Sequence, residues 1–503
     1  MATESARTSL TGVRNLPVGS DAGSRLDHER PRTPRHSTAN APASIGSWQW
    51  LVDAPRVLLL GVLAYAPWAY GCTREWSLAA LNVALLVVVS LWIAGCLARR
   101  CLPRIHPILL VIVVLLLLQG WWMTVNSGWS YDAQFAPHPR PNLSSRLPGS
   151  IDHAVSLPSM LGLSGMLGII CFAADLAGDR RWRKLMLRTM ALVGVSLVIL
   201  GLSQKVTHSP GIFWQQEGHE ATFFGSYRYH ANAGTFINLT WPLVAVAFAQ
   251  ALRRERRRGR QLLWGGALVI CLTGALANTS RASGAITVFM LLAWGGVTAW
   301  RRFRRPGDPI NPGMAAGAVM AFVTLIFLAV AVGGLDATLR RWGQFDREIS
   351  LSNSRLMGAL VCVDMLPQSG WLGFGPGTFQ TAFPFFNKDT SESTSGVWLQ
   401  AHQDYLQTLV EWGWLGAFLW ACLGLGALAW VIWSLVRHRG FSSRSERLAA
   451  TGMTAALLAT FTHAVVDFPL QIASLQLYTA ILVGICWHHV MTTIATRRGS
   501  ESA

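Results

Sequence analysis

Three side chains that can exchange protons lie within residues 402–411, in the segment HQDYLQTLVE. His402 carries an imidazole, which titrates near neutral pH, and Asp404 and Glu411 carry carboxylates. On a helix, residues 404, 408 and 411 share one face, so the two carboxylates would point the same way. These residue types predict acid–base chemistry with His402, Asp404 and Glu411 as the candidate catalytic groups. The alternative is a histidine that only forms structural hydrogen bonds.

A second pair of the same type, His463 and Asp467, lies in the segment FTHAVVDFPLQI. Their four-residue spacing would allow the two side chains to hydrogen-bond each other on one helical face. The pair is therefore predicted either to support the first group or to be purely structural.

Three arginines lie in polar segments beside apolar runs: Arg228 in SYRYHANAG, Arg281 in NTSRASG and Arg355 in NSRLMGAL. A guanidinium is a planar fork that binds phosphate oxygens in pairs, which suits a diphosphate. An arginine at a membrane surface can also extend its charge to lipid headgroups without binding any substrate. All three are candidate diphosphate ligands, and the anchoring alternative stays open.

The segment GWLGFGPGTF holds four glycines, of which Gly375 and Gly377 are candidate supporting residues. Consecutive backbone N–H groups in such a turn can form a nest for phosphate, and a purely structural turn is the other possibility. No spacing of cysteine and histidine typical of a metal site occurs, so the sequence predicts neither a metal ion nor a cofactor.

The elements that carry these residues are predicted to be membrane spans. The 503 residues are 51% hydrophobic and only 13% charged, which is typical of a multi-span membrane protein. Because a span needs about 20 mainly apolar residues, the sequence predicts an all-α polytopic membrane protein with about twelve transmembrane helices. The predicted spans are 56–72, 76–98, 105–124, 156–177, 189–206, 231–252, 262–280, 282–300, 313–334, 412–436, 449–466 and 472–493.

The formal net charge of +17 is distributed in a way that fits a membrane protein. More than half of the basic residues lie in short segments that fall on one side of the membrane if the helices alternate: 99–104, 180–188, 253–260, 301–305, 437–447 and 497–498. Cytosolic loops are the ones enriched in Lys and Arg, so both termini are predicted to be cytosolic. The charge therefore indicates topology and not nucleic-acid binding, and the candidate residues above face the opposite side.

This orientation divides the chain into five predicted regions. They are a disordered cytosolic tail at 1–47, nine spans within 48–334, a large periplasmic catalytic loop at 335–411, three spans within 412–496 and a cytosolic tail at 497–503. The tail at 1–47 is rich in Ser, Arg, Pro and Ala and has no apolar run with which to form a core. The loop is predicted to contain a short helix in SNSRLMGALVCVDMLPQSG that stops at Pro367.

Taken in order, five segments resemble the O-antigen ligase and O-antigen polymerase family of bacterial membrane glycosyltransferases. They are SYRYHANAGTFINLTWPL, NTSRASG, NSRLMGALVCVDMLPQSGWLGFGPGTF, HQDYLQTLVEWGWLG and HAVVDFPLQI. Carried over by position, the resemblance implies that the family's arginine after the seventh span falls on Arg281. The arginine of the loop helix falls on Arg355 and the essential histidine on His402. The family often has Asn after this histidine, where this chain has Gln403.

The resemblance implies transfer of a glycan from an undecaprenyl-diphosphate carrier to an acceptor hydroxyl, on the periplasmic face of the bacterial inner membrane. It implies a metal-independent reaction with inversion at the anomeric carbon, in which arginines stabilise the leaving diphosphate. The acceptor can be a glycan, a lipid-A core or a protein, so ligase, polymerase and protein O-oligosaccharyltransferase remain open. A transporter or flippase also remains open, although such proteins usually carry ionisable residues near mid-span. Membrane lipids are the other expected partners.

Overall fold

The computed structural model describes residues 49–215, 222–253, 258–303, 343, 354–387, 398–437 and 440–501. The predicted disordered tail at 1–47 and the ninth predicted span at 313–334 lie outside these residues.

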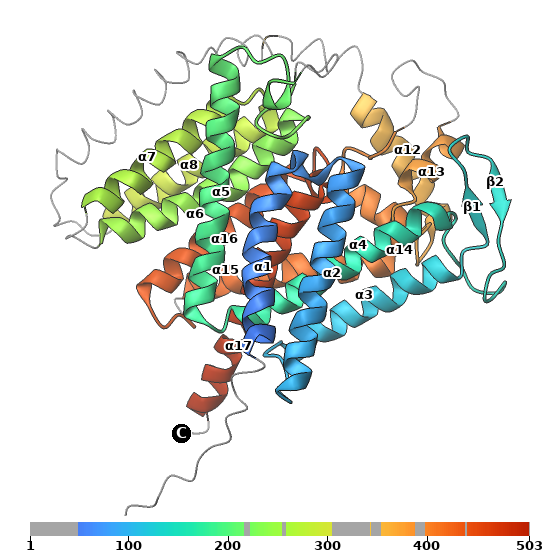
Figure 1. The fold of residues 1–503 in the computed structure, drawn as a ribbon, viewed down its shortest axis with the longest axis horizontal. Coiled ribbons are helices and arrows are strands. Elements are labelled where there is room, and N and C mark those ends of the chain that lie inside the picture. Colours follow the sequence, from blue (N-terminus) through green and yellow to red (C-terminus); the bar gives the residue numbers. More distant parts are fainter. Residues whose placement is uncertain are drawn as a thin grey trace, which may run out of the picture. The chain divides into compact units, whose positions relative to one another are not determined.

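Long apolar helices make up the first part of the described chain (Figure 1). They are α1 (Gln49–Trp68), α2 (Glu75–Ala98), α3 (Pro107–Val125), α4 (His153–Leu176), α5 (Arg180–Val206), α6 (His230–Leu252), α7 (Arg258–Ala277) and α8 (Arg281–Phe303). Polar caps mark the starts of two of them. Asp152 accepts a hydrogen bond from the backbone N–H of Ala154 in α4, and Asp179 does the same for Arg181 and Trp182 in α5. These caps satisfy backbone donors that the apolar runs leave unpaired.

The remaining helices include two short ones in the predicted periplasmic loop. The helices are α12 (Ser354–Ser369), α13 (Phe379–Phe386), α14 (Asp404–Ala421), α15 (Ala427–Arg437), α16 (Arg444–His463) and α17 (Ala473–Glu501). A π-helical turn, η3 (Cys422–Gly426), joins α14 to α15, and short 3-10 turns are η1 (Tyr70–Cys72), η2 (Ile212–Trp214) and η4 (Pro469–Gln471). The loop helix α12 continues through Pro367 to Ser369, so the predicted stop at Pro367 is two residues early.

One small antiparallel sheet, β1 (Trp129–Tyr131) and β2 (Pro137–Pro139), lies between α3 and α4. The ring of Tyr131 meets the ring of Phe385 in α13 with 6.1 Å between centroids. The sheet therefore contacts the loop helices, as Figure 1 also shows.

Eight helical segments among the described residues are long and apolar enough to cross a membrane. They are α1 to α7 and the continuous segment Asp404–Arg437. Helices α8, α16 and α17 form where spans are predicted, but the described part of each is shorter or more polar than these eight. The nearly all-α membrane architecture is confirmed with eight candidate spans, and the total of about twelve stays a prediction.

Two predicted boundaries can be compared directly with the helices. The hairpin predicted at NTSRASG is confirmed, because α7 ends at Ala277 and α8 begins at Arg281. The tenth span was predicted from residue 412. Helix α14 begins earlier, at Asp404, and is interrupted near the predicted start by Gly413, whose φ of 62° is not helical. Its start is capped by Gln403, whose side chain accepts a hydrogen bond from the backbone N–H of Leu406. Residues 404–411 are therefore helical and not loop.

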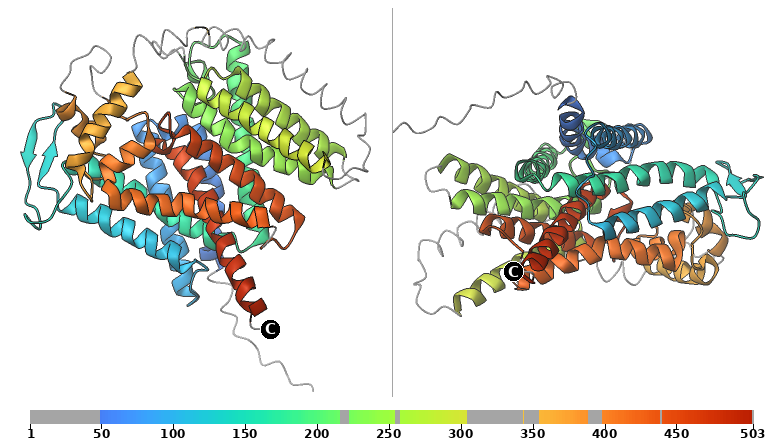
Figure 2. Two further views of the ribbon diagram at one scale, coloured as in Figure 1. Left: turned by 180° about the vertical axis from the view of Figure 1, so that it is seen from behind. Right: turned by 90° about the horizontal axis from the view of Figure 1, so that it is seen from below.

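The helices pack around α17 and α6. Helix α17 packs against both α4 and α1, α16 packs against α6, and α1 packs against α2. Seen from behind, the C-terminal helices lie in front of the blue helices α1 and α2 (Figure 2). Segments from the two ends of the chain thus share one apolar core.

A separate, smaller apolar cluster holds the loop helices. It contains Cys362 and Met365 of α12, Phe379 and Phe383 of α13 and Val410 of α14, all fully buried. Burial of such side chains stabilises by about 1.5–3 kcal/mol each. The cluster therefore fixes α12 and α13 against the first turns of α14.

Candidate active site

Four segments that are distant in the sequence meet at the starts of α6 and α14 and the end of α16. Tyr229 directly precedes α6, Arg355 lies in the first turn of α12, and His402 lies two residues before the start of α14. Asp467 lies in the turn between α16 and α17. Hydrogen bonds and ion pairs join these four residues, which we call the Asp467 cluster.

Asp467 is the centre of this cluster. Its Oδ1 lies 3.2 Å from Nδ1 of His402, and its Oδ2 accepts a 3.0 Å hydrogen bond from the hydroxyl of Tyr229. Nη2 of Arg355 forms an ion pair with Oδ2 at 3.6 Å. Burial alone would raise the pKa of Asp467, but the hydrogen bond from His402 and the charge of Arg355 outweigh it and hold this pKa below its ordinary value. Asp467 is therefore an ionised carboxylate at neutral pH.

The contact with Asp467 determines how His402 presents its ring. When Nδ1 carries the proton and donates to the carboxylate, Nε2 keeps its lone pair and can accept a proton. The backbone of His402 has a φ of 51°, a left-handed conformation that costs a non-glycine residue about 1–2 kcal/mol. Outliers of this type are concentrated at functional sites. The side chain is 29% exposed and lines a cavity.

The hydroxyl of Tyr229 connects the carboxylate of Asp467 to the guanidinium of Arg355. It donates to Asp467 and accepts a hydrogen bond from Nη2 of Arg355. Burial, and after it the negative charge of Asp467, raises the pKa of Tyr229, so the phenol stays protonated at neutral pH. Its ring stacks on Phe468 with 5.7 Å between centroids and 2° between the ring planes. Tyr229 is thus held by both its hydroxyl and its ring.

The guanidinium of Arg355 is held by protein groups and is still partly exposed to solvent. Its Nη1 donates to the carbonyl oxygen of Val466 at 3.2 Å, and its Nη2 reaches Tyr229 and Asp467. The side chain is still 51% exposed. A half-exposed ion pair adds little stability, so the contacts of Arg355 mainly orient its guanidinium.

A cavity of about 670 Å³ opens beside His402. Its wall includes the rings of Tyr229, Trp398 and Phe468 and the polar side chains of Arg228 and Gln471, with His402 among them. The volume lies in the range of about 300–1,000 Å³ that is usual for small-molecule sites. The cavity can therefore hold a substrate group within reach of the imidazole.

Asp404 does not line this cavity, and its carboxyl group is held by the turn after α16. Its Oδ2 accepts a 2.8 Å hydrogen bond from the backbone N–H of Leu470, and its Oδ1 accepts from Nε2 of Gln471 at 3.2 Å. Its own backbone N–H donates to the carbonyl of Ala464 at 3.0 Å. Asp404 is 1% exposed. The carboxylate therefore attaches the start of α14 to the turn that carries Asp467.

Glu411 and the glycine-rich segment bind each other. The Glu411 carboxylate accepts hydrogen bonds from the backbone N–H groups of Gly377 and Phe379 and from Nε2 of Gln407, at 3.1, 3.3 and 3.1 Å. The N–H of Gly375 donates to the main-chain carbonyl of Glu411 at 2.9 Å. The glycine-rich turn thus holds a carboxyl group, but that group is a side chain of the protein. These N–H groups are not open to a phosphate.

The second predicted pair does not form between its two members. Nδ1 of His463 hydrogen-bonds the hydroxyl of Thr235 in α6, and the side chain of Asp467 faces His402 and Tyr229. His463 is 1% exposed and lies in the contact between α16 and α6. Asp467 is therefore the member of this pair that contacts His402 and Tyr229, two residues that line the cavity.

The hairpin with Arg281 lies beside the start of α6. Nδ2 of Asn278 donates to the carbonyl of His230 at 3.0 Å, one residue after Tyr229. Arg281 is the first residue of α8 and is half-buried, and Arg228 lines the cavity. Arg228, Arg281 and Arg355 therefore lie at the same end of the helices.

Sequence reasoning missed Tyr229 and the pairing of His402 with Asp467. Tyr229 stands beside a candidate arginine in SYRYHANAG, yet no local pattern distinguishes it from an interfacial tyrosine. Among the described residues, no group of three or more His, Cys, Asp or Glu side chains is arranged to hold a metal ion.

Fold and site together define a polytopic α-helical membrane protein with a cationic, imidazole-containing cavity at one end of its helices. Residues 266–421 match the family model described as O-antigen ligase, and this match supports the assignment to the O-antigen ligase and polymerase family. The matched range contains Arg281, Arg355 and His402 but ends before Asp467. A comparison with curated proteins finds no match.

Proposed function

We propose that the protein transfers a glycan from an undecaprenyl-diphosphate carrier to an acceptor hydroxyl on the periplasmic face of the bacterial inner membrane. The family match supports a lipid-linked glycan ligase or polymerase. The single observation that carries the proposal is the hydrogen bond between His402 and Asp467 beside an open cavity. This pair has the chemistry of a general base with an orienting carboxylate.

The reaction begins at the acceptor hydroxyl. Asp467 holds the Nδ1–H of His402, and Nε2 accepts the hydroxyl proton as the acceptor oxygen attacks the anomeric carbon. The bond between the anomeric carbon and the phosphate oxygen breaks, and its electron pair leaves with the undecaprenyl diphosphate. In-line attack opposite the leaving group inverts the anomeric configuration.

The leaving diphosphate requires positive charge. Arg355, oriented by Val466 and Tyr229, supplies a preorganised guanidinium at the cavity end of α12. Arg228 and Arg281 add charge at the same end of the helices. In this proposal the arginines neutralise the diphosphate and no metal ion takes part.

The same proposal assigns Asp404 and Glu411 a positioning role. Both carboxylates are buried in hydrogen bonds to backbone N–H groups, Asp404 at the turn of Asp467 and Glu411 at the start of α13. Asp404 joins the start of α14, just after His402, to the turn at 467–471. Glu411 joins α14 to the segment before α13. Proton transfer is left to His402.

The orientation remains the one that the basic segments favour. Both termini are cytosolic, and the loop 335–411 lies in the periplasm with the Asp467 cluster. The lipid carrier would then enter from the outer leaflet, with its diphosphate at headgroup level.

The test is a transfer assay with the purified full-length protein and a labelled undecaprenyl-diphosphate glycan. Acceptors are offered separately as a second lipid-linked glycan, a lipid-A core and a protein. The expected result is release of undecaprenyl diphosphate in equal amount to new glycan–acceptor bonds, at a rate that a chelator leaves unchanged. Movement of the intact donor between leaflets without cleavage would instead identify a flippase.

A further inference from the structure

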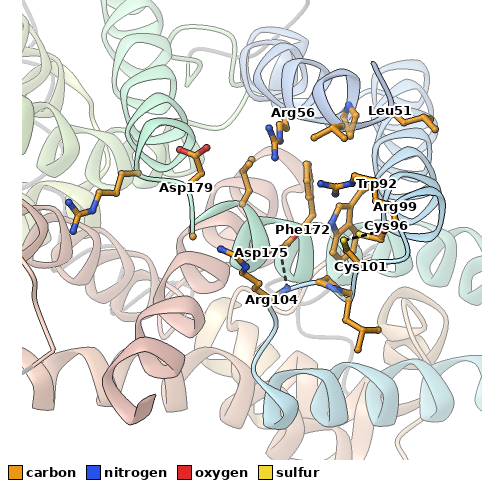
Figure 3. A pocket seen from close by; sticks show the side chains of 17 residues that line it. Leu51, Arg56, Trp92, Cys96, Arg99, Cys101, Arg104, Phe172, Asp175 and Asp179 are labelled. Carbon is orange, nitrogen blue, oxygen red and sulfur yellow. Dashed lines mark hydrogen bonds between the residues drawn. The ribbon is translucent and has the colours of Figure 1, made fainter. Parts of the chain in front are cut away.

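A second cavity, of about 630 Å³, lies among the start of α1, the end of α2, the segment before α3 and the junction of α4 with α5. Figure 3 shows three arginines that line this cavity: Arg56 from α1, Arg99 from the end of α2 and Arg104 from the segment before α3. Arg180, from the first residue of α5, also lines it. Of these four arginines, Arg56 is ion-paired with Asp53 at 3.4 Å and Arg180 with Glu446 at 3.3 Å. Arg99 and Arg104 are the two that form no ion pair among the described residues.

This cavity and the candidate active site lie at opposite ends of the same two helices. Leu51 near the start of α1 lines the arginine cavity, and Cys72, just past the end of α1, lines the cavity beside His402. In α2 the order is reversed, from Leu78 to Arg99. Helices of this length rise about 30 Å, which is the thickness of the hydrocarbon core. If α1 and α2 cross the bilayer as their length and composition indicate, the two cavities lie at headgroup level in opposite leaflets.

The carboxylates of the arginine cavity are already used by structural donors. Oδ2 of Asp175 accepts from Nε1 of Trp92 at 2.9 Å, and Oδ1 accepts from the backbone N–H of Arg104 at 2.8 Å (Figure 3). Asp179 caps the first turn of α5. Within the described parts of the chain, the guanidinium of Arg104 forms no hydrogen bond or ion pair. Among the described residues neither of these carboxylates forms an ion pair with an arginine of the cavity, so Arg99 and Arg104 keep guanidinium donors for a ligand.

Apolar side chains complete the wall. Leu51, Pro55 and Phe172 line the cavity beside the arginines, and Leu102 at its edge is 93% exposed. A wall with guanidinium groups on one part and hydrocarbon on another matches a ligand that carries both a phosphate and acyl chains. Basic recesses between membrane helices on the cytosolic side bind anionic lipid headgroups in this way.

We propose that this cavity binds the phosphodiester of an anionic glycerophospholipid in the leaflet opposite the candidate active site. In the orientation given above this is the cytosolic leaflet. Arg99 and Arg104 are the principal phosphate ligands, and the apolar wall takes the glycerol and the first acyl carbons. The site requires no glycan transfer, so its test and the test of the proposed function can fail separately.

Cys101 provides a probe in the unmodified protein. All eight cysteines lie in the described residues, and Cys101, which lines the cavity, is the exposed one. The full-length protein in detergent is labelled with a maleimide while phosphatidylglycerol, phosphatidylcholine or inorganic phosphate is added. Phosphatidylglycerol is expected to slow the labelling of Cys101, and phosphatidylcholine and inorganic phosphate are not. Equal protection by all lipids would contradict the role of the arginines, and protection by inorganic phosphate alone would contradict a lipid ligand.

A matched pair of double variants tests the ligands. Arg99→Gln/Arg104→Gln removes two charges from the cavity, and Arg181→Gln/Lys184→Gln removes two exposed charges from the same end of the helices. Loss of one or two charge-assisted hydrogen bonds should weaken the binding of phosphatidylglycerol about 10- to 100-fold, measured by native mass spectrometry. The control variant should bind it as the wild type does. An equal loss in both variants would show nonspecific attraction and overturn the site.

An unfolded variant would imitate a loss of binding, so a third variant is included. Arg99→Lys/Arg104→Lys retains both charges and loses the planar forks. It should elute as the wild type does in size-exclusion chromatography and bind phosphatidylglycerol with intermediate affinity. Wild-type affinity in both the Gln and Lys variants would overturn the proposal.

Discussion

Nδ1 of His402 lies 3.2 Å from Oδ1 of Asp467, across a separation of 65 residues. The two residues belong to different elements, the entry of α14 and the turn after α16. Asp404 holds these elements together through the backbone N–H of Leu470 at 2.8 Å. The imidazole is therefore oriented by a carboxylate whose own position depends on a second, buried carboxylate.

Asp467→Asn should abolish most of the transfer activity. The amide cannot accept from both the imidazole and the phenol as an anion does, so the tautomer of His402 is no longer enforced. Loss of a positioned proton acceptor costs about 10²–10⁴ in rate. The measurement is the rate per molecule of purified protein. Asp364 in α12 is exposed, so Asp364→Asn serves as the control and should keep the wild-type rate.

Tyr229→Phe should have a smaller effect on the same rate. The ring keeps its stack on Phe468, while Asp467 loses a donor and Arg355 loses an acceptor. A loss of about tenfold is expected, which corresponds to one hydrogen bond of about 1.4 kcal/mol. Tyr131→Phe, in the small sheet, is the matched control. A wild-type rate for Tyr229→Phe would mean that the phenol does not position the site.

Arg355→Lys should lower the rate about 100-fold, because a single ammonium cannot replace the donors that orient the fork toward a leaving diphosphate. Arg355→Ala should be lower still. The side chain is 51% exposed, so the amount of protein in the membrane should remain normal. If Arg355→Lys and the wild type are equally active, Arg355 is only a headgroup anchor.

Glu411→Gln should affect stability more than chemistry. The variant replaces two carboxyl oxygens that accept from three N–H donors with an amide, which has one oxygen and directs its own N–H atoms at a remaining donor. A loss of about 1–3 kcal/mol is expected, seen as a lower midpoint of thermal unfolding in detergent. The surviving folded protein should keep most of its activity per molecule. Normal stability with lost activity would show that Glu411 takes part in catalysis and is not only structural.

The apolar runs predicted where the helices lie, because a span must bury about 20 residues whatever its neighbours are. They also predicted the hairpin before Arg281, where two spans are separated by only a few polar residues. Periodicity could not predict that α14 begins at Asp404, because polar residues at 404, 407 and 411 resemble a loop until their buried partners are known. The partner of His402 was equally unpredictable, since it depends on how α14 packs beside α16.

The central claim is that the imidazole of His402 takes the proton of the acceptor hydroxyl. The most direct measurement is the transfer rate of purified His402→Ala, with and without added imidazole, together with its thermal unfolding. We expect a loss of about 10²–10⁴ in rate, near-normal stability and partial recovery when imidazole enters the cavity. Transfer by His402→Ala at the wild-type rate, or a loss of activity that only follows loss of folded protein, would contradict it.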